Sequence, residues 1–200
     1  MSDVTLFLVR HAPHVLQGRV QVGRTEGVAL AKGSDRVAQR AAGRLRRERL
    51  DAVYCSPLQR ARDTAAPIAA VHDLEPIADA DLLELDFGDW TGRAFDAFDG
   101  DPDYRAWNAA RAVHRVPRGE TMLECQARMM RAVERARRDH PDGRVALVSH
   151  GDPLKAVVLY LLGLPIDSWN RFDLDPASVS AAVVGDWGAK LLFLNERSAA

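Results

Sequence analysis

The sequence has few cysteines, no large excess of one charge and no long apolar run, and each absence excludes a class of protein. Its two cysteines, Cys55 and Cys125, form no CxxC pair and no zinc-type spacing. The chain therefore has no disulfide framework, which suits a reducing compartment. The net charge is −1 over 200 residues, of which 28% are charged. That balance gives no overall field to attract nucleic acid or an anionic membrane surface.

Secretory and membrane-spanning segments are also missing from the sequence. The first residues, MSDVTLFLVRH, include no basic region, and their apolar run is too short for a signal peptide. The longest apolar run, AVVLYLLGL at 156–164, is stopped by Pro165 and is too short to cross a bilayer. Because the length allows one domain with a sizeable core, we expect a single cytoplasmic domain over residues 1–200.

Three short apolar runs predict buried strands. They are VTLFLV (4–9), LDAVYC (50–55) and RVALV (144–148). None alternates apolar with polar residues, which is typical of parallel strands that are buried on both faces. Segments with helical spacing of apolar residues separate them, at 37–45, 125–136 and 154–161. This alternation predicts an α/β fold, a three-layer α/β/α sandwich around a mostly parallel sheet.

The last part of the chain predicts a different kind of strand pairing. Two apolar runs, 179–184 and 190–194, flank the turn-like sequence GDWG. Such an arrangement favours a hairpin, or two edge strands that close the sheet.

Polar residues that follow the three buried strands give the strongest functional signal. Arg10 and His11 follow the first strand, Arg60 follows the second strand by about one helical turn, and His150 follows the third. The carboxyl ends of parallel strands meet at one edge of a sheet, where ligands bind. Helices that begin after Ser56 and after His150 would add backbone N–H donors there. The pattern predicts an anion site, and phosphate is the anion that fits it best.

These residues lie in motifs that resemble the histidine phosphatase superfamily, the phosphoglycerate mutase-like group. The motifs are RHA (10–12), SPLQRARDTA (56–65), LLELDFGDWTG (82–92) and SHG (149–151). They occur in the family's order, and GRTEGVAL (23–30) and PRGETM (117–122) resemble its connecting segments. The resemblance covers roughly residues 4–185. Within this family, the sequence looks most similar to the α-ribazole phosphatase-like and broad-specificity phosphatase branches.

The resemblance implies a phosphomonoester hydrolase that works through a phosphohistidine. His11 would attack phosphorus, Arg10, Arg60 and His150 would hold the phosphoryl oxygens, and Glu84 would protonate the leaving oxygen. We expect no metal and no other cofactor, because the guanidinium groups can supply the positive charge.

Further expectations concern the surroundings of these groups. Gln17 and Gly151 are candidates for additional phosphate contacts. A general acid must be protonated part of the time, so we expect a raised pKa for Glu84, caused by burial or by a neighbouring acid such as Asp86. Asp152 is expected to cap the helix that follows His150.

The sequence departs from the family pattern next to the nucleophile. Glycine, then Glu or Gln, then Thr or Ser usually follow it, whereas this chain has Ala12, Pro13 and His14. Alanine adds a Cβ where the backbone approaches phosphate, and proline removes an N–H donor. Gln17 stands where asparagine is frequent. These changes leave the reaction type in place but affect the expected rate and substrate.

Three rival interpretations of the motifs remain open. Cys55 precedes Arg60 as C-x4-R, but the cysteine phosphatase loop needs C-x5-R, and Pro57 interrupts it. His11 and His14 with His150 and Asp152 have residue types that bind metals, although the nearby arginines disfavour a dication. A non-catalytic phosphate-binding module is the third interpretation, and the presence of both His11 and Glu84 argues against it.

By resemblance, residues 90–118 form a small inserted cap over the site. The cap's aromatic residues are expected to contact a substrate or to form the cap's own core. Its arginines are candidates for binding a second anionic group. A cofactor-dependent phosphoglycerate-type mutase is the alternative activity, but the segment is short and has no adjacent arginine pair. The expected partner is a small phosphorylated substrate, without nucleic acid or membrane, and a homodimer is left open.

The aromatic residues of this segment are Trp90, Phe95, Phe98, Tyr104 and Trp107. The arginines in or beside it are Arg93, Arg105, Arg111, Arg115 and Arg118.

Overall fold

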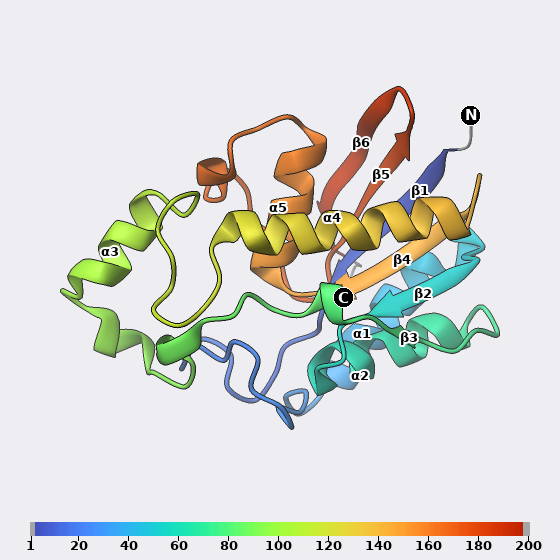
Figure 1. Cartoon of the computed structure of the whole chain (residues 1–200). Coiled ribbons are helices and arrows are strands. Elements are labelled where there is room, and N and C mark those ends of the chain that lie inside the picture. Colours follow the sequence, from blue (N-terminus) through green and yellow to red (C-terminus); the bar gives the residue numbers. More distant parts are fainter. Residues whose placement is uncertain (1–2, 198–200) are drawn as a thin grey trace.

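One six-stranded sheet organises the chain, in the order β3-β2-β4-β1-β5-β6 (Figure 1). The computed structural model describes residues 3–197. The strands are β1 (Val4–Arg10), β2 (Ala52–Cys55), β3 (Ile77–Ala78), β4 (Arg144–Ser149), β5 (Val179–Gly185) and β6 (Gly188–Glu196). β1, β2, β3 and β4 run parallel, whereas β5 and β6 are antiparallel to their neighbours. The mostly parallel α/β sheet expected from the sequence is therefore confirmed.

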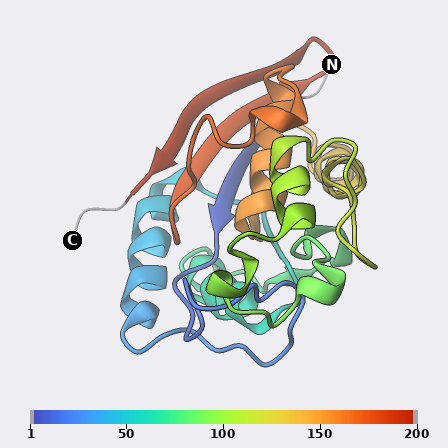
Figure 2. The same cartoon turned by 90° about the vertical axis from the view of Figure 1, so that its left-hand side faces the viewer.

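Helices cover both faces of the sheet, which gives three layers (Figure 2). The α-helices are α1 (Ser34–Leu45), α2 (Gln59–Ala70), α3 (Pro102–Ala109), α4 (Met122–Asp139) and α5 (Gly151–Leu161). Short 3-10 turns join them: η1 (Arg46–Glu48), η2 (Ala80–Leu82), η3 (Gly88–Trp90), η4 (Phe95–Phe98) and η5 (Ile166–Ser168). No helix among residues 3–197 is long and apolar enough to cross a membrane.

The central strand β1 shows why the apolar runs are continuous. Leu6 and Leu8 pack into the core cluster that contains residues of α4 and α5, whereas Phe7 and Val9 pack into the cluster with α1 and α2. Successive side chains of a strand point to opposite faces. A strand that is covered on both faces therefore needs apolar residues at every position.

The predicted hairpin is present as β5 and β6, with its turn at Asp186–Trp187. β6 is an edge strand whose residues are exposed or half-buried, whereas most of β5 is buried. The two-residue strand β3 was not predicted, because two exposed residues carry no periodic signal.

The N-terminus of α4 is fixed by local hydrogen bonds. The Thr121 hydroxyl accepts from the Glu124 N–H, and the Glu124 carboxylate accepts from the Thr121 N–H. This capping box satisfies N–H groups that would otherwise lack partners. It sets the start of α4 directly after the PRGETM segment.

The segment 90–118 contains η4 and α3 and lies beside the carboxyl ends of the strands (Figure 1). Trp90, Phe98, Tyr104 and Trp107 pack on one another with ring centroids 4.4–6.1 Å apart. These rings build an aromatic core of the segment, which the sequence left as one of two roles. Phe95 is different, because it is 38% exposed and lines a cavity.

Candidate active site

The strand ends converge as the sequence predicts, around a cavity of about 210 Å³. Arg10 and His11 end β1, Arg60 lies in the first turn of α2 after β2, and His150 precedes α5 after β4. A backbone hydrogen bond of 2.9 Å from the His11 N–H to the Ser149 carbonyl ties two of these ends together. The cavity is lined by the predicted residues Arg10, His11, Gln17, Arg60, Glu84 and Gly151, among others.

His11 is a buried, neutral imidazole with a defined tautomer. Its Nδ1–H donates to the carbonyl of Ala12 at 2.8 Å. A carbonyl can only accept, so Nδ1 carries the proton and Nε2 keeps its lone pair. Burial lowers the pKa of His11 well below its ordinary value, and the charges of Arg60 and Arg10 lower it further. The ring is therefore suited to act as a nucleophile through Nε2.

His150 lies next to His11 and has one nitrogen without a partner. The two ring centroids are 5.1 Å apart. The Nε2 of His150 shares a 2.8 Å hydrogen bond with the Ser56 hydroxyl. Its buried Nδ1 has no hydrogen-bond partner within residues 3–197 and lies 3.9 Å from the Glu84 carboxylate. Burial lowers the pKa of His150 well below the usual range, with nearby His11 and Arg60 acting in the same direction.

The two arginines are held by backbone carbonyls. Arg10 donates from Nη1 to the Leu174 carbonyl at 2.6 Å, and Arg60 donates from Nη2 to the Gly23 carbonyl at 2.7 Å. In both side chains the buried Nε has no partner among the described residues. Burying a guanidinium group with an unsatisfied donor decreases the stability of the folded protein when no partner is bound. Such donors are what an anion in the cavity would satisfy.

Glu84 has the raised pKa that a general acid requires. Burial raises the pKa of Glu84 to about 7, and the charge of Asp152 raises it as well, against the opposing charge of Arg60. The neighbouring acid is thus Asp152, and the expected contribution of Asp86 was wrong. Asp86 does not line the cavity and lies instead 3.5 Å from Nη1 of Arg24.

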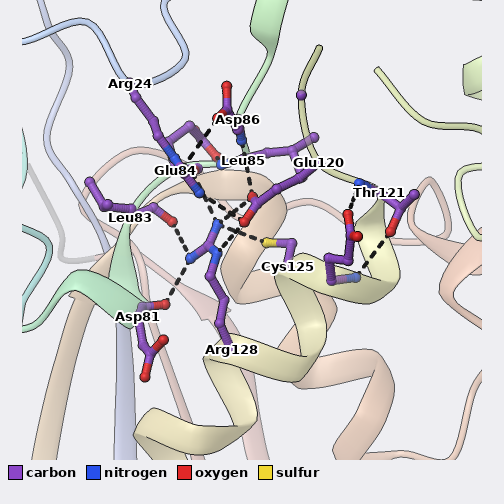
Figure 3. A network of polar contacts seen from close by, with 12 residues as sticks. Arg24, Asp81, Leu83, Glu84, Leu85, Asp86, Glu120, Thr121, Cys125 and Arg128 are labelled. Carbon is purple, nitrogen blue, oxygen red and sulfur yellow. Dashed lines mark hydrogen bonds and ion pairs between the residues drawn. The ribbon is translucent and has the colours of Figure 1, made fainter. Parts of the chain in front are cut away.

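Two arginines from different parts of the chain hold the backbone of Glu84 (Figure 3). Arg24 donates from Nε to the Glu84 carbonyl at 2.9 Å, and Arg128 donates from Nη2 to the same oxygen at 3.0 Å. Arg128 also donates to the carbonyls of Asp81 and Leu83, both at 2.7 Å. These contacts fix the position of the segment that carries the candidate acid.

Glu120 lies between these two arginines and pairs with both of them. Its carboxylate is 2.9 Å from Arg24 and 2.9 Å from Arg128. Two glycines allow the segments 84–88 and 117–120 to touch. A Cβ on Gly88 would lie 2.1 Å from the Pro117 carbonyl oxygen, and one on Gly119 would lie 2.2 Å from that of Asp86. The glycines of both motifs are therefore required by close backbone approach.

The contacts of Ala12, Pro13 and His14 show how the structure accommodates this unusual sequence after His11. The Ala12 side chain is fully buried in the α1/α2 core cluster, and its N–H donates to the Thr64 hydroxyl at 2.9 Å. The Pro13 carbonyl accepts from the Ala31 N–H at 2.9 Å. The added Cβ thus packs in the core, and the cavity contains His14 rather than Ala12.

His14 supplies a neutral ring to the cavity wall. Its ring centroid is 5.4 Å from that of His11, and its Nδ1 accepts from the Leu16 N–H at 3.3 Å. Burial, together with the charges of Arg60 and Arg10, lowers the pKa of His14 to about 4. At neutral pH its Nε2 is therefore a donor.

The remaining sequence candidates have different outcomes. Gln17 lines the cavity, and its buried Oε1 has no partner among residues 3–197. Gly151 is the first residue of α5, and a Cβ there would make only an ordinary 3.5 Å contact with Arg10. Asp152 makes no capping hydrogen bond, so that expectation was wrong. It accepts instead from Arg111 at 3.0 Å.

Four of the five arginines named in the segment 90–118 are engaged in ion pairs. Arg93 pairs with Asp101, Arg111 with Asp152, Arg115 with Glu124, and Arg118 with Asp89. None of the five arginines lines the cavity. The structure therefore does not support the idea that they bind a second anionic group there.

The rival sites of the sequence are not formed by the described residues. Burial raises the pKa of the Cys55 thiol to about 11, so it is a protonated core residue rather than a thiolate nucleophile. No group of three or more His, Cys, Asp or Glu side chains with metal-binding geometry occurs within residues 3–197.

Several residues that line the cavity or hold its groups in place were not predicted from the sequence. Ser56 was placed only at a strand end, and the roles of Thr64, Arg128 and Lys155 had no local signal. Their partners are far away in the chain, as in the pair Ala12–Thr64. The PRGETM and GRTEGVAL motifs did mark Glu120 and Arg24, whose function becomes visible only once the segments meet.

Comparisons with known proteins agree on one family. The family model described as histidine phosphatase superfamily (branch 1) matches residues 6–197. Phosphoserine phosphatase 1 of Hydrogenobacter thermophilus is 33% identical over 199 residues, which cover 96% of this chain and 92% of that protein. Two solved structures superpose on nearly the whole chain. The YhfR protein of Bacillus stearothermophilus has a TM-score of 0.91 at 26% identity and covers 98% of both chains. The alpha-ribazole phosphatase of Shigella flexneri has a TM-score of 0.84 at 26% identity, with the same coverage.

Proposed function

Because this chain belongs to branch 1 of the histidine phosphatase superfamily, we propose that it hydrolyses small phosphomonoesters through a phosphohistidine at His11. The observation that carries the proposal is the fixed tautomer of His11. Its Nδ1–H is bound to the Ala12 carbonyl, so the Nε2 lone pair is free in a cavity that Arg10 and Arg60 also line, and the centroid of the His150 ring is 5.1 Å from that of His11.

The proposed reaction has two steps that share the same groups. In the first, Nε2 of His11 attacks phosphorus, the bond from phosphorus to the leaving oxygen breaks, and Glu84 gives its proton to that oxygen. In the second, water attacks the phosphohistidine, the N–P bond breaks, and the Glu84 carboxylate takes the proton from water. Inorganic phosphate leaves, and both groups return to their initial states.

We assign the oxygens of the transferred phosphoryl to two positive groups, Arg10 and Arg60, and to the neutral ring of His150. Each of the three has a buried nitrogen that lacks a partner within the described residues. Gln17 and the N-terminus of α5 at Gly151 are assigned as further contacts. Donors that are already in place stabilise the charge of the transition state, and the mechanism requires no metal ion.

Replacing the nucleophile tests the proposal. His11→Ala should reduce turnover of p-nitrophenyl phosphate by at least about 10³-fold, because the covalent route is lost. Acid-labile, base-stable phosphate should appear on the wild type after denaturing quench and be absent from the variant. His114→Ala, at an exposed position outside the cavity, is the matched control. Substantial turnover by folded His11→Ala would exclude the mechanism.

Hydrolysis is favoured over the mutase alternative by the state of the cap arginines. A mutase must hold a doubly charged sugar acid while it protects the phosphohistidine from water. Four of the arginines between 93 and 118 are already engaged in ion pairs. Release of phosphate should therefore exceed interconversion of the phosphoglycerates. Dominant interconversion would keep the His11 chemistry and change the assigned activity.

The names of the relatives do not decide the substrate. One relative is a phosphoserine phosphatase and one structural neighbour is an alpha-ribazole phosphatase, at 33% and 26% identity. The residues that line the cavity of this chain are the better guide to its substrate class.

A further inference from the structure

Two oppositely charged side chains line the cavity and take no part in the proposed phosphoryl transfer. They are Asp152 and Lys155, both on α5. Residues three apart on a helix lie on the same face. Gly151, at the start of the same helix, also lines the cavity. One turn of α5 therefore presents a proposed phosphate contact, a carboxylate and an ammonium group to the same space.

The carboxylate of Asp152 is held in a fixed orientation. Arg111 donates from Nη1 to its Oδ1 at 3.0 Å. The guanidinium lies between two indole rings, 3.7 Å from the centroid of Trp107 and 3.4 Å from that of Trp169. A carboxylate has two oxygens and about four acceptor sites. A single hydrogen bond from Arg111 thus orients Asp152 and leaves capacity to accept from a ligand.

Asp152 shares the cavity with Glu84. Both side chains line it, and the Glu84 carboxylate lies 3.9 Å from His150, which is two residues before Asp152. The charge of Asp152 also helps to raise the pKa of Glu84. Glu84 is the group proposed to protonate the leaving oxygen. A cationic group on the departing alcohol would therefore meet Asp152.

Lys155 is largely buried, but the carboxylate that pairs with its ammonium group is exposed to solvent. The residue is 9% exposed, and its Nζ is 3.2 Å from Oδ1 of Asp173, whose side chain is 86% exposed. The rings of Trp169 and Phe172 lie 5.6 and 5.8 Å from Nζ. Ion pairs with exposed carboxylates contribute little. A substrate carboxylate inside the cavity can replace Asp173 as the partner of Lys155.

Resting on the proposed phosphatase function, we propose that Asp152 and Lys155 form a leaving-group subsite for phosphate monoesters of hydroxy-amino acids, such as O-phosphoserine. Asp152 binds the ammonium of the substrate and Lys155 binds its carboxylate. Both substrate groups are attached to one carbon, which matches two protein charges on one helical turn. Phe95 and the small volume of the cavity, about 210 Å³, favour a compact alcohol.

Matched substrates separate the two charges. O-Phosphoethanolamine keeps the ammonium and lacks the carboxylate, whereas the phosphate ester of 3-hydroxypropionate keeps the carboxylate and lacks the ammonium. All three esters have a primary alkyl oxygen as leaving group. The wild type should hydrolyse O-phospho-L-serine with a kcat/KM at least about tenfold above each of the others, because a missing substrate charge leaves a protein charge unpaired.

Variants assign each preference to one residue. Lys155→Met removes the charge, keeps an unbranched side chain only one atom shorter, and should remove the preference over phosphoethanolamine. Asp152→Asn should remove the preference over the 3-hydroxypropionate ester. Ratios of kcat/KM within one variant cancel any effect on the chemical step. Lys190→Met and Asp63→Asn, both at exposed positions outside the cavity, are the matched controls and should keep both preferences.

The outcomes separate the subsite from the phosphatase activity. Similar kcat/KM values for the three esters, or variants that leave the ratios unchanged, would overturn the subsite. If no ester is hydrolysed, including p-nitrophenyl phosphate, the phosphatase proposal fails and calorimetric binding of the three esters to the wild type decides the subsite. A dissociation constant for phosphoserine about tenfold lower than for the others supports it, and equal constants overturn it.

Discussion

At the scale of single residues, Glu84 connects burial with pH dependence. Its pKa is raised to about 7, mainly by burial. In the proposed mechanism the protonated form is the acid of the first step, and its population declines as pH rises above that value. For alkyl phosphates, kcat should fall by about tenfold per pH unit above about pH 7, as expected for one titrating group. For p-nitrophenyl phosphate, whose leaving group needs little protonation, the profile should be much flatter over the same range.

A substitution checks that Glu84 is the titrating group. Glu84→Gln should slow alkyl phosphates by about 10²- to 10⁴-fold and abolish the decline above pH 7, with a much smaller effect on the aryl ester. Glu134→Gln, at an exposed position of α4, should leave both profiles unchanged. Equal losses on both substrates would assign the acid to another group, with Asp152 the next candidate in the same cavity.

The sequence predicts residues whose function depends on their place at a strand end. Arg10, His11, Arg60 and His150 each follow an apolar run directly or by one turn. In the structure the first three line one cavity, and the His150 ring lies next to that of His11. The sequence does not predict partners that are distant in the chain. Asp152 looked like a helix cap because α5 begins beside it, but Arg111, 41 positions away, takes its carboxylate. A long-range hydrogen bond outweighed the local preference.

At the scale of elements, α4 positions the candidate acid by means of Arg128. This buried side chain donates to the carbonyls of Asp81, Leu83 and Glu84. Arg128→Met leaves the carbonyls of Asp81 and Leu83 without this donor and leaves Arg24 as the remaining arginine partner of Glu120, so the free energy of unfolding should decrease by about 3–5 kcal/mol. Because the segment of Glu84 loses its support, kcat for alkyl phosphates should fall more than kcat for the aryl ester.

Arg131 is the matched control for Arg128 on the same helix. It also reaches Asp81, but through a side chain that is mostly exposed. Arg131→Met should change stability by less than about 1 kcal/mol and keep the ratio of alkyl to aryl turnover. Urea unfolding and the two kcat values are the measurements. A ratio that Arg128→Met leaves unchanged would make Arg128 a purely structural residue.

Elements were predictable where burial imposes a pattern on many residues. β1, β2 and β4 are apolar at successive positions because both faces are covered, and α4 shows buried residues at helical spacing. β3 was missed because two exposed residues suffice to pair with β2. The register of the strands and the packing of the segment 90–118 depend on contacts that no local pattern encodes.

At the scale of the whole molecule, buried neutral histidines make stability depend on pH. Burial lowers the pKa values of His11, His14 and His150, so their contribution to stability is present above about pH 6.5 and is lost as pH falls. The raised pKa of Glu84 acts oppositely, because the folded state binds its proton more tightly. Burial also lowers the pKa of His72, which acts in the same direction as the three histidines. Between pH 7.5 and 5.5 the histidine protons favour the unfolded chain and the Glu84 proton favours the folded chain, so the free energy of unfolding should decrease by at least about 2 kcal/mol.

One histidine variant separates this effect from general acid sensitivity. His14→Asn removes one of these histidines, so the loss of stability between the two pH values should become smaller by about 1 kcal/mol. Urea unfolding at pH 7.5 and 5.5 provides the comparison. Stability that is equal or greater at pH 5.5 in the wild type would show that these histidines are not held neutral in the folded protein.

The position of β1 between β4 and β5 also orders events on the ribosome. β1 leaves first, yet its parallel partner β4 begins at Arg144, about 140 residues later. At about 5–20 residues per second, synthesis takes roughly 7–30 s to bridge that interval. For all of that time an apolar strand with two open edges has no native neighbour. We therefore expect β1 to be accessible to chaperones and other nascent chains before His11 and His150 can meet each other.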